Sequence, residues 1–532
     1  HYFTKARHFW DPSWCARDPF LQSAHAHYVF YATFGLLTRV FTFDQSAWIG
    51  RLIGWGLLAS GWCAVASRIC SARWFGLCSA WIFLGLATIG NWSGEWVIGG
   101  IEAKVISYAC AWWSLASFFR KDPTESALTS TTAGWWNFMT RFVDHRMQAA
   151  AWAGAAVSFH PVVGIWHTGA LVLAAISIEG FRGTFGNLRS WIAAGATWIV
   201  LSAPGLIPAI AMIRDANPDD AYAADYIQVY HRLNHHLDPL KFRADSYVYY
   251  GILIALVVLS QIVTRFRRSA STAEKLLFRY VMIAVSVALA GLLLRASPKI
   301  AQWLLTANAF PTLRDTLSAV IQYENRLPKW LKFYPFRLAD VAVPMAFAIQ
   351  SATWMLGESA ATTQSGTTLT VWQRSWGLIP YALIGLIGIG TVIGSLNAAK
   401  SDTRLSPELF ADWRDVCHWL RRETPADALC YVPAQGFGLK WYAERPEYVS
   451  HKDCPQDAAG IVAWNQRFRY IVKWSSQQNG EGYSRQMIRQ LHQKTGIDYV
   501  ITPTIGSKLA PFPIEPIYQN PSYLVFRLED AL

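Results

Sequence analysis

The chain has 532 residues, of which 53% are hydrophobic and only 15% are charged, and its mean hydropathy is positive at +0.18. A soluble protein carries about 25% charged residues, so this composition excludes an ordinary soluble protein and favours one that spans a membrane. The net charge of +12 does not indicate nucleic-acid binding, because no aromatic-plus-basic RNA-binding motif accompanies it and basic residues also collect in cytoplasmic loops.

The N-terminal segment mixes aromatic, basic and acidic side chains. Residues 1–20, HYFTKARHFWDPSWCARDPF, fit neither a signal peptide nor a membrane span. Segment 25–41 is apolar with aromatic residues at helical spacing, which predicts an amphipathic helix along the membrane surface. The alternative is a true span, which would invert the predicted topology. Residues 1–45 are therefore predicted to form an external loop with membrane-surface helices.

Charged residues are sparse between residues 46 and 396, and apolar runs recur at about the 20-residue length of a span. This region is the predicted transmembrane domain. Its spans, about ten, are expected near residues 47–67, 74–91, 98–118, 147–159, 162–179, 190–213, 247–264, 277–294, 336–356 and 376–396. The fourth and fifth are short and predict either a tight hairpin or one broken element, and residues 299–322 are too polar for a span.

Basic residues alternate between successive loops, which orients the spans. The basic residues placed on the cytoplasmic side are Arg68, Arg73, Arg120, Lys121, Arg141, Arg146, Arg182, Arg189, Arg265, Arg267, Arg268, Lys275 and Arg279. Loops 92–97, 214–246 and 295–335 are then external, together with the N-terminal segment and the C-terminal tail. Because the first predicted span runs from outside to inside, we expect a further membrane helix upstream of His1.

Residues 404–532 are rich in charge and read as a separate α/β domain on the external side. The predicted helices are PELFADWRDVCHWLRRET and YSRQMIRQLHQKTG, and the predicted strands are DALCYVP, YIVKW (470–474), DYVITP (498–503) and SYLVFRL (522–528). In an external domain Cys430 and Cys454 are the favoured disulfide pair. The predicted fold class is mainly α: a polytopic transmembrane helical domain with a small C-terminal α/β domain.

Three carboxylates are candidate catalytic groups. Asp11 and Asp18 each precede a proline in the N-terminal segment, where a carboxylate could act as a general base or organise a metal beside a lipid substrate. The alternative is helix capping, which suits an acid before a proline. Glu102 stands where an external loop meets a predicted span, and ionisable residues at such positions are costly unless they pair or function.

Three cationic or basic side chains are candidate ligands for a lipid phosphate. Lys104 could bind phosphate as a compact charge or extend to the interface as a snorkelling lysine. Arg337 could bind phosphate in a bidentate manner or only pair with Asp340 at i, i+3. His160 is at the external end of its span, with a satisfied buried histidine as the alternative. His231 and His235 at i, i+4 predict a polar surface helix rather than a metal site, because no HExxH motif is present.

The chain resembles two groups of membrane proteins. HYFTKARHFW and HAHYVFYATFGLLTRVFTFDQSAWIGRLIG resemble the external loop and surface helix of the GT-C glycosyltransferases, such as protein mannosyltransferases and lipid A aminoarabinose transferases. The phrases HYFTKARHFWDPSWCARD, GGIEAK, FYPFRLAD and KWYAERPEYVSHKDCPQDAAGIVAWNQR resemble an uncharacterised bacterial membrane family, common in planctomycetes, that is a domain of unknown function. The GT-C likeness covers mainly the first 120 or so residues and the layout.

The GT-C resemblance implies transfer of a sugar from a polyprenyl-phosphate donor to an external acceptor. It implies a bacterial inner-membrane protein with a periplasmic C-terminal domain, and it leaves open a divalent cation as cofactor. In GT-C enzymes the key acid starts the loop, a position that would fall just before His1, so Asp18 would be a second carboxylate or not catalytic. The alternatives are a transporter or flippase for a lipid-linked substrate and a non-catalytic envelope protein.

Overall fold

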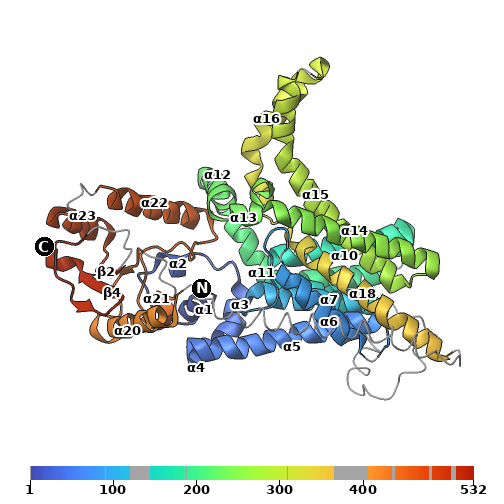
Figure 1. Cartoon of the computed structure of the whole chain (residues 1–532), viewed down its shortest axis with the longest axis horizontal. Coiled ribbons are helices and arrows are strands. Elements are labelled where there is room, and N and C mark those ends of the chain that lie inside the picture. Colours follow the sequence, from blue (N-terminus) through green and yellow to red (C-terminus); the bar gives the residue numbers. More distant parts are fainter. Residues whose placement is uncertain are drawn as a thin grey trace. The chain divides into compact units, whose positions relative to one another are not determined.

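The computed structural model describes residues 2–72, 74–89, 91–119, 144–186, 188–307, 309–364, 405–433, 438–477, 482–504 and 511–531. The chain folds as two compact units. Unit 1 combines His1–Gly50, Pro208–Ile227 and Asn397–Leu532, and unit 2 combines Arg51–Ile207 and Gln228–Leu396. The fold class is mainly α, with long apolar helices and a small sheet near the C-terminus (Figure 1).

Unit 2 is built from helices. The long ones, two of which begin or end in unit 1, are α5 (Phe43–Ile69), α6 (Phe75–Ile89), α7 (Ala103–Phe118), α9 (His145–Phe159), α10 (Pro161–Phe185), α11 (Leu188–Arg214), α14 (Ala244–Arg267), α15 (Thr272–Thr306) and α18 (Arg337–Gln364). Short elements connect them: η2 (Ile227–Arg232), α13 (Asn234–Leu237), η3 (Pro239–Lys241), η4 (Pro311–Leu313), α16 (Arg314–Gln322), η5 (Tyr323–Arg326) and α17 (Pro328–Leu331).

Five helices are long and apolar enough to cross a membrane, as expected for an integral membrane protein in a lipid bilayer. They are α5, α10 over Pro161–Phe181, α11, α14 over Ala244–Phe266, and α15, and they coincide with five of the predicted spans. Helices α6, α7 and α9 have only 15 or 16 residues, which at 1.5 Å per residue is shorter than a bilayer core of about 30 Å. The predicted span at 376–396 lies outside the described residues, as do Arg73, Arg120, Lys121 and Arg141.

Helices α7, α9 and α10 pack as an antiparallel set. Ser107 and Ser114 of α7 donate hydrogen bonds to the carbonyl oxygens of Ala156 and Ala149 of α9, both at 2.8 Å, because the alanine-rich face of α9 lets the backbones approach closely. The chain reverses direction between α9 and α10, and the first turn of α10 packs closely against the last turns of α9. Only glycine fits at position 164, because a Cβ there would lie 2.3 Å from the backbone nitrogen of Val157. The two short predicted spans therefore form a tight hairpin.

Unit 1 contains a four-stranded sheet of order β1-β2-β4-β3, in which only β1 and β2 are parallel. The strands are β1 (Cys430–Tyr431), β2 (Tyr499–Pro503), β3 (Tyr518–Gln519) and β4 (Tyr523–Arg527). The helices are α1 (Tyr2–Trp10), α2 (Pro19–Gln22), α3 (Tyr28–Thr33), η1 (Phe34–Leu36), α4 (Leu37–Val40), α12 (Pro218–Tyr226), α20 (Pro407–Glu423), α21 (Leu439–Tyr442), α22 (Ala458–Ser475), α23 (Arg485–Thr495) and η6 (Leu528–Ala531).

Alternation along the strands places a hydrophobic cluster on each face of the sheet. Ile501 and Val525 pack in the cluster that includes α20, whereas Val500 and Phe526 pack in the cluster formed with α22 and α23. This is the period-2 pattern of a strand that is covered on both faces. The helices predicted from PELFADWRDVCHWLRRET and YSRQMIRQLHQKTG and the strands predicted at 498–503 and 522–528 are confirmed, and Gly496 ends α23 in the left-handed conformation at φ +68°.

Three local expectations differ from the structure. The predicted strand YIVKW lies inside α22, because its apolar residues continue the helical spacing of the preceding turns. The predicted amphipathic helix at 25–41 is divided into α3, η1 and α4. Cys430 and Cys454 are both free, so the favoured disulfide is absent from the structure.

Candidate functional site

A loop between α6 and α7 is held by one buried carboxylate of α18. Asp340 accepts hydrogen bonds from the backbone nitrogens of Trp92 (3.0 Å), Ser93 (2.8 Å) and Glu95 (3.3 Å) and from the hydroxyl of Ser93 (2.6 Å). A carboxylate that accepts several backbone hydrogen bonds is satisfied without a counterion. Asp340 therefore fixes the loop and sets the position of Glu95.

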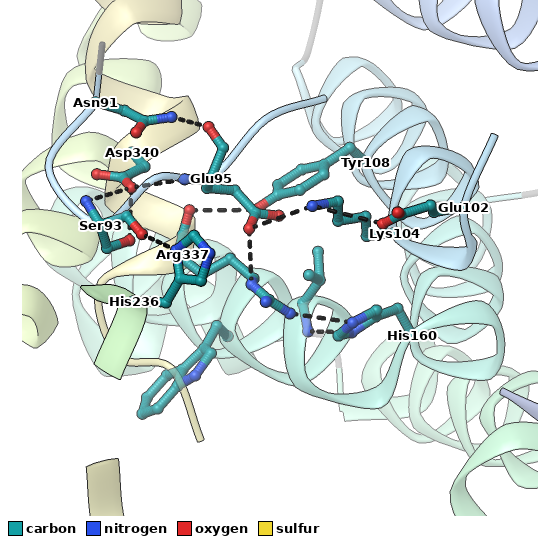
Figure 2. A network of polar contacts seen from close by, with 12 residues as sticks. Asn91, Ser93, Glu95, Glu102, Lys104, Tyr108, His160, His236, Arg337 and Asp340 are labelled. Carbon is teal, nitrogen blue, oxygen red and sulfur yellow. Dashed lines mark hydrogen bonds and ion pairs between the residues drawn. The ribbon is translucent and has the colours of Figure 1, made fainter. Parts of the chain in front are cut away.

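Two cations converge on Glu95. The Nε atom of Arg337 lies 3.0 Å and the Nζ atom of Lys104 lies 3.7 Å from the same carboxylate oxygen, Oε2 (Figure 2). Lys104 also lies 3.6 Å from Oε2 of Glu102. Arg337 of α18 thus pairs with Glu95 in the loop between α6 and α7. The alternative in the sequence analysis paired Arg337 only with Asp340, three residues further along α18. We call Glu95, Glu102, Lys104, His160 and Arg337 the Glu95 cluster.

Two histidines contact Arg337 and the loop that carries Glu95. The NH1 group of Arg337 contacts Nε2 of His160 at 3.1 Å. The Nδ1 atom of the same ring accepts a hydrogen bond of 3.4 Å from the backbone nitrogen of Val163 and so caps α10. His236 makes a hydrogen bond through Nδ1 with the carbonyl oxygen of Ser93, so a residue of α13 clamps the same loop that Asp340 holds. Figure 2 shows Glu95 between Lys104 and Arg337, with His160 beyond Arg337.

Aromatic rings orient the two cations. Lys104 lies over the ring of Trp96 at 4.1 Å, and the guanidinium carbon of Arg337 lies 3.8 Å from the ring centre of Tyr334. The hydroxyl of Tyr108 donates a hydrogen bond of 3.1 Å to the carbonyl oxygen of Arg337. Such rings stabilise desolvated cations without neutralising them, so both side chains keep their positive charge beside Glu95.

Burial distinguishes the members of the cluster. Glu95, Lys104 and His160 are each 7% exposed, whereas the side chain of Glu102 is 23% exposed. Glu102 stands at the N-cap of α7 but makes no capping hydrogen bond. It is therefore the carboxylate of this cluster that remains open to a reacting molecule.

All these groups lie at one end of the unit 2 helices. Arg295, in the second half of α15, pairs with Asp238 (3.0 Å) and Glu324 (3.1 Å), and His236 and Asp340 both contact the loop at 91–95. The three loops that the charge pattern placed on the external side, 92–97, 214–246 and 295–335, thus contribute residues to one polar end. Beyond Arg295, α15 and α16 project from the other helices of unit 2 (Figure 1).

Asp18 is fully buried in unit 1, and both of its carboxylate oxygens have protein partners. Its Oδ1 caps α2 by accepting from the backbone nitrogens of Phe20 (3.0 Å) and Leu21 (3.1 Å). Its Oδ2 accepts from the backbone nitrogen of Glu447 (3.0 Å) and lies 3.1 Å from Nζ of Lys440. Asp18 is therefore a helix-capping residue, which was the alternative to a catalytic role in the sequence analysis.

Asp11 lies at the end of α1. It accepts a hydrogen bond of 2.5 Å from Ser13 and lies 3.9 Å from Arg7. The hydrogen bond from Ser13 holds the pKa of Asp11 below its usual value.

Lys440 is the centre of a second buried ionic group. Its Nζ lies 3.1 Å from Asp18, 3.0 Å from Glu447 and 2.7 Å from Asp453. We call these four residues the Lys440 cluster. Desolvation and two neighbouring carboxylates raise the pKa of Glu447 to about 7 despite its contact with Lys440, since three carboxylates share one ammonium. The cluster joins the N-terminal segment to the C-terminal domain within unit 1.

Within the described ranges, no group of three or more His, Cys, Asp or Glu side chains could hold a metal ion. The Lys440 cluster contains three carboxylates, but the ammonium group occupies the position between them. The residues that the structure describes thus contain no set of ligands for the divalent cation that the sequence analysis left open.

Sequence reasoning named Glu102, Lys104, His160 and Arg337, and the structure brings these four together. It did not select Glu95 as a site residue, although NWSGEW shows an acid and small residues in a loop next to apolar runs. It also missed Ser93 and His236. No local signal marks them, because their partners lie far away along the chain.

The chain is similar to a family model in its C-terminal part and to a solved structure over most of its length. Residues 411–471, which include Lys440, Glu447 and Asp453, match the model of a domain of unknown function, DUF6798. Among curated proteins, none matches the chain. The crystal structure of the Archaeoglobus fulgidus oligosaccharyltransferase in the apo form is similar over 94% of this chain, with a TM-score of 0.40 and 11% identity. The chain spans 65% of the length of that structure.

Proposed function

We propose that this protein is an integral-membrane glycosyltransferase that transfers a sugar from a polyprenyl-phosphate donor to an acceptor hydroxyl on the external face. The observation that carries the proposal is the convergence of Lys104 and Arg337 beside the partly exposed Glu102, at one end of membrane-length helices. We further infer a bacterial inner membrane and an external, periplasmic position for residues 404–532.

The two cations suit a phosphate leaving group. When the bond between the sugar C1 and the phosphate oxygen breaks, the oxygen keeps the electron pair and the lipid phosphate gains negative charge. Arg337 binds phosphate oxygens through a planar fork and Lys104 acts as a compact charge. Preorganised cations at the position where charge develops are worth most in a site that excludes water, and both side chains here are largely buried.

Glu102 suits the general base. As the acceptor oxygen forms its bond to C1, its proton passes to a carboxylate within hydrogen-bond distance. Glu102 lies 3.6 Å from Nζ of Lys104, so the candidate base stands next to a cation proposed to bind the leaving phosphate. Asp18 is not part of this proposal, because both of its oxygens are engaged and the side chain is fully buried.

A phosphate can reach Lys104 and Arg337 only if the carboxylate of Glu95 moves or shares its contacts with them. Its Oε2 now lies against both cations, so a phosphate must replace it or join it. The loop around Glu95 carries Gly94 at φ +79° and Gly99 at φ +157°, and glycine tolerates such backbone angles. A shift of this loop would release Glu95 and expose the cations.

A transporter of lipid-linked substrates is the other candidate function. Such a protein would place polar groups along a path through the bilayer. Among the described residues of unit 2, the buried charged side chains Glu95, Lys104, Asp238, Arg295 and Asp340 lie at one end of the helices and Arg146 at the other. This distribution favours a site at the membrane boundary over a path.

The test is sugar transfer in membrane vesicles that contain the full chain, supplied with a panel of radiolabelled polyprenyl-phosphate sugars. Arg337→Gln and Lys104→Gln each remove a donor to the leaving phosphate, and we expect transfer to fall by about 100-fold or more. Glu102→Gln should abolish the base while retaining binding of polyprenyl phosphate.

The matched controls are Arg326→Gln and Lys299→Gln, which remove exposed cations from the same end of the unit 2 helices. We expect wild-type transfer from both. Full transfer by Arg337→Gln and Lys104→Gln would refute the site. Binding of the donor with movement across the bilayer, but no transfer, would establish the transporter instead.

A further inference from the structure

A hollow lies at the other end of the unit 2 helices. Its empty volume, counted with the part open to solvent, is about 410 Å³, and its lining includes Phe118, His145, Arg146, Ile178, Glu179 and Thr272. These residues come from the end of α7, the start of α9, the end of α10 and the start of α15. Helices α7 and α10 have their opposite ends at the Glu95 cluster, and α15 runs from the hollow to Arg295 and beyond it, so the hollow belongs to the opposite membrane face.

The hollow contains a buried cation. Arg146 is 8% exposed, and its guanidinium carbon lies 5.4 Å from the ring centre of Trp191. In the part of the chain that the structure describes, this guanidinium has neither a hydrogen-bond acceptor nor a carboxylate at ion-pair distance. A buried charge without a partner is costly, and an aromatic face compensates only part of that cost.

The nearest carboxylates do not supply the missing partner. Asp144 caps α9 through the backbone nitrogen of Arg146 at 3.1 Å, accepts from the hydroxyl of Ser190, and lies 2.9 Å from His145. Glu179 is exposed at the wall of the hollow. The start of α15 adds the positive end of a helix dipole, and Thr272 belongs to its first turn. The hollow therefore combines a buried guanidinium and a helix N-terminus with one exposed acid.

We propose that this hollow binds a phosphate group, supplied either by the headgroup of an anionic phospholipid or by free phosphate. A guanidinium offers several donors in a fixed plane, which matches phosphate oxygens. The hollow lies where α10 ends and α15 begins, at the level at which headgroups meet a membrane helix. The same face carries Arg268 and Lys275, which raise the local concentration of anions. This site is independent of the Glu95 cluster.

The test is native mass spectrometry of the full chain released from neutral detergent micelles, with phosphatidylglycerol, phosphatidylcholine or inorganic phosphate added separately. We expect phosphatidylglycerol to remain bound and phosphatidylcholine to be lost. Arg146→Gln should lower the occupancy by about tenfold or more, since one charge-assisted contact is worth about 1.5–3 kcal/mol. Arg189→Gln, which removes an exposed cation of the same face, should leave it unchanged.

A second variant keeps the test decisive if Arg146→Gln does not fold. Glu179→Gln removes an exposed acid from the hollow, so it should raise phosphatidylglycerol occupancy, whereas Asp315→Asn, an exposed acid of α16, should not. Retention of inorganic phosphate with the same dependence on Arg146 and Glu179 would identify the soluble ion as the source. Equal occupancy in Arg146→Gln and Arg189→Gln, or no response to Glu179→Gln, would overturn the proposal.

Discussion

Glu95 balances the charge of the candidate site. It is nearly buried, and Lys104 and Arg337 both lie within ion-pair distance of one of its oxygens. Its other oxygen, Oε1, is buried without a hydrogen-bond partner among the described residues. This arrangement is costly for a purely structural ion pair, because a buried pair is favourable only when its remaining polar atoms are satisfied.

Replacing Glu95 by Gln should destabilise unit 2 and strengthen anion binding. Removing one partner of a buried ion pair costs about 3–5 kcal/mol, since two buried cations lose their counterion. We expect a lower thermal unfolding midpoint in detergent that added polyprenyl phosphate partly restores. Glu102→Gln is the control, and its effect should be smaller because that side chain is partly exposed. Equal losses without rescue would contradict the assignment.

Gly94 holds the loop against His236. Its φ is +79°, and a Cβ at this position would lie 2.7 Å from the ring of His236. Gly94→Ala should therefore displace the loop and destabilise unit 2 by about 1–3 kcal/mol, which thermal unfolding measures. Gly56→Ala, in α5 with open space around it, should leave the midpoint unchanged or raise it. A neutral Gly94→Ala would show that the loop is not held as described.

At the scale of elements, capping residues connect distant segments. Asp457 caps α22 by accepting from the backbone nitrogen of Gly460 at 2.7 Å, and it also accepts from the backbone nitrogen of Ala24 at 3.2 Å. Arg17 adds a contact of 2.6 Å with Asp498 and a hydrogen bond of 2.7 Å to the carbonyl oxygen of Gly496. The N-terminal segment is thus tied to helix ends of the C-terminal domain within unit 1.

Asp457→Ala should weaken both the cap and this tie. Loss of an N-cap costs about 1 kcal/mol, and the freed nitrogen of Ala24 adds to that loss. Hydrogen exchange followed by mass spectrometry should show faster exchange in α22 and in residues 18–27. Ser484→Ala removes only the cap of α23, so it should not affect residues 18–27. Unchanged exchange in that segment in both variants would contradict the tie.

At the scale of the whole molecule, the Lys440 cluster makes the stability of unit 1 depend on pH. Burial raises the pKa of Glu447 to about 7, above its usual value, so the folded state holds this proton more tightly than the unfolded chain. The contribution of this carboxyl to stability is full below about pH 4.5 and is lost as the pH rises towards 7.

Glu447→Gln cannot ionise, so this variant should not lose stability as the pH rises from 4.5 to 7. Relative to the wild type, its free energy of unfolding should increase between pH 4.5 and 7 by up to about 1.4 kcal/mol per pH unit. Hydrogen exchange of peptides from α20 and β2, compared between variant and wild type at each pH, measures the difference. Glu423→Gln, an exposed acid of α20, should show no such trend. A constant difference across this window would show that Glu447 is ionised throughout.

Prediction from sequence succeeded where a local pattern carries the information. The long apolar helices, the helix start at Pro407, the helix end at Gly496 and the strand at 498–503 follow from periodicity and from start and stop signals. It failed at YIVKW, where a short apolar run fits a strand and a helix equally well. Lys104 and Arg337 were selected because charges beside apolar runs are costly, yet Glu95 was not chosen as their partner.

The sequence by itself determined that this protein spans a membrane, which segments are helical, and which charged residues need an explanation, because each of these depends on neighbouring residues. Only the tertiary structure decided how the charges pair: Arg337 with Glu95, Asp340 with a loop almost 250 residues earlier, Asp18 with Lys440, and Arg146 beside a hollow. These pairings depend on desolvation and on contacts between distant segments, and neither is encoded in the spacing of residues along the chain.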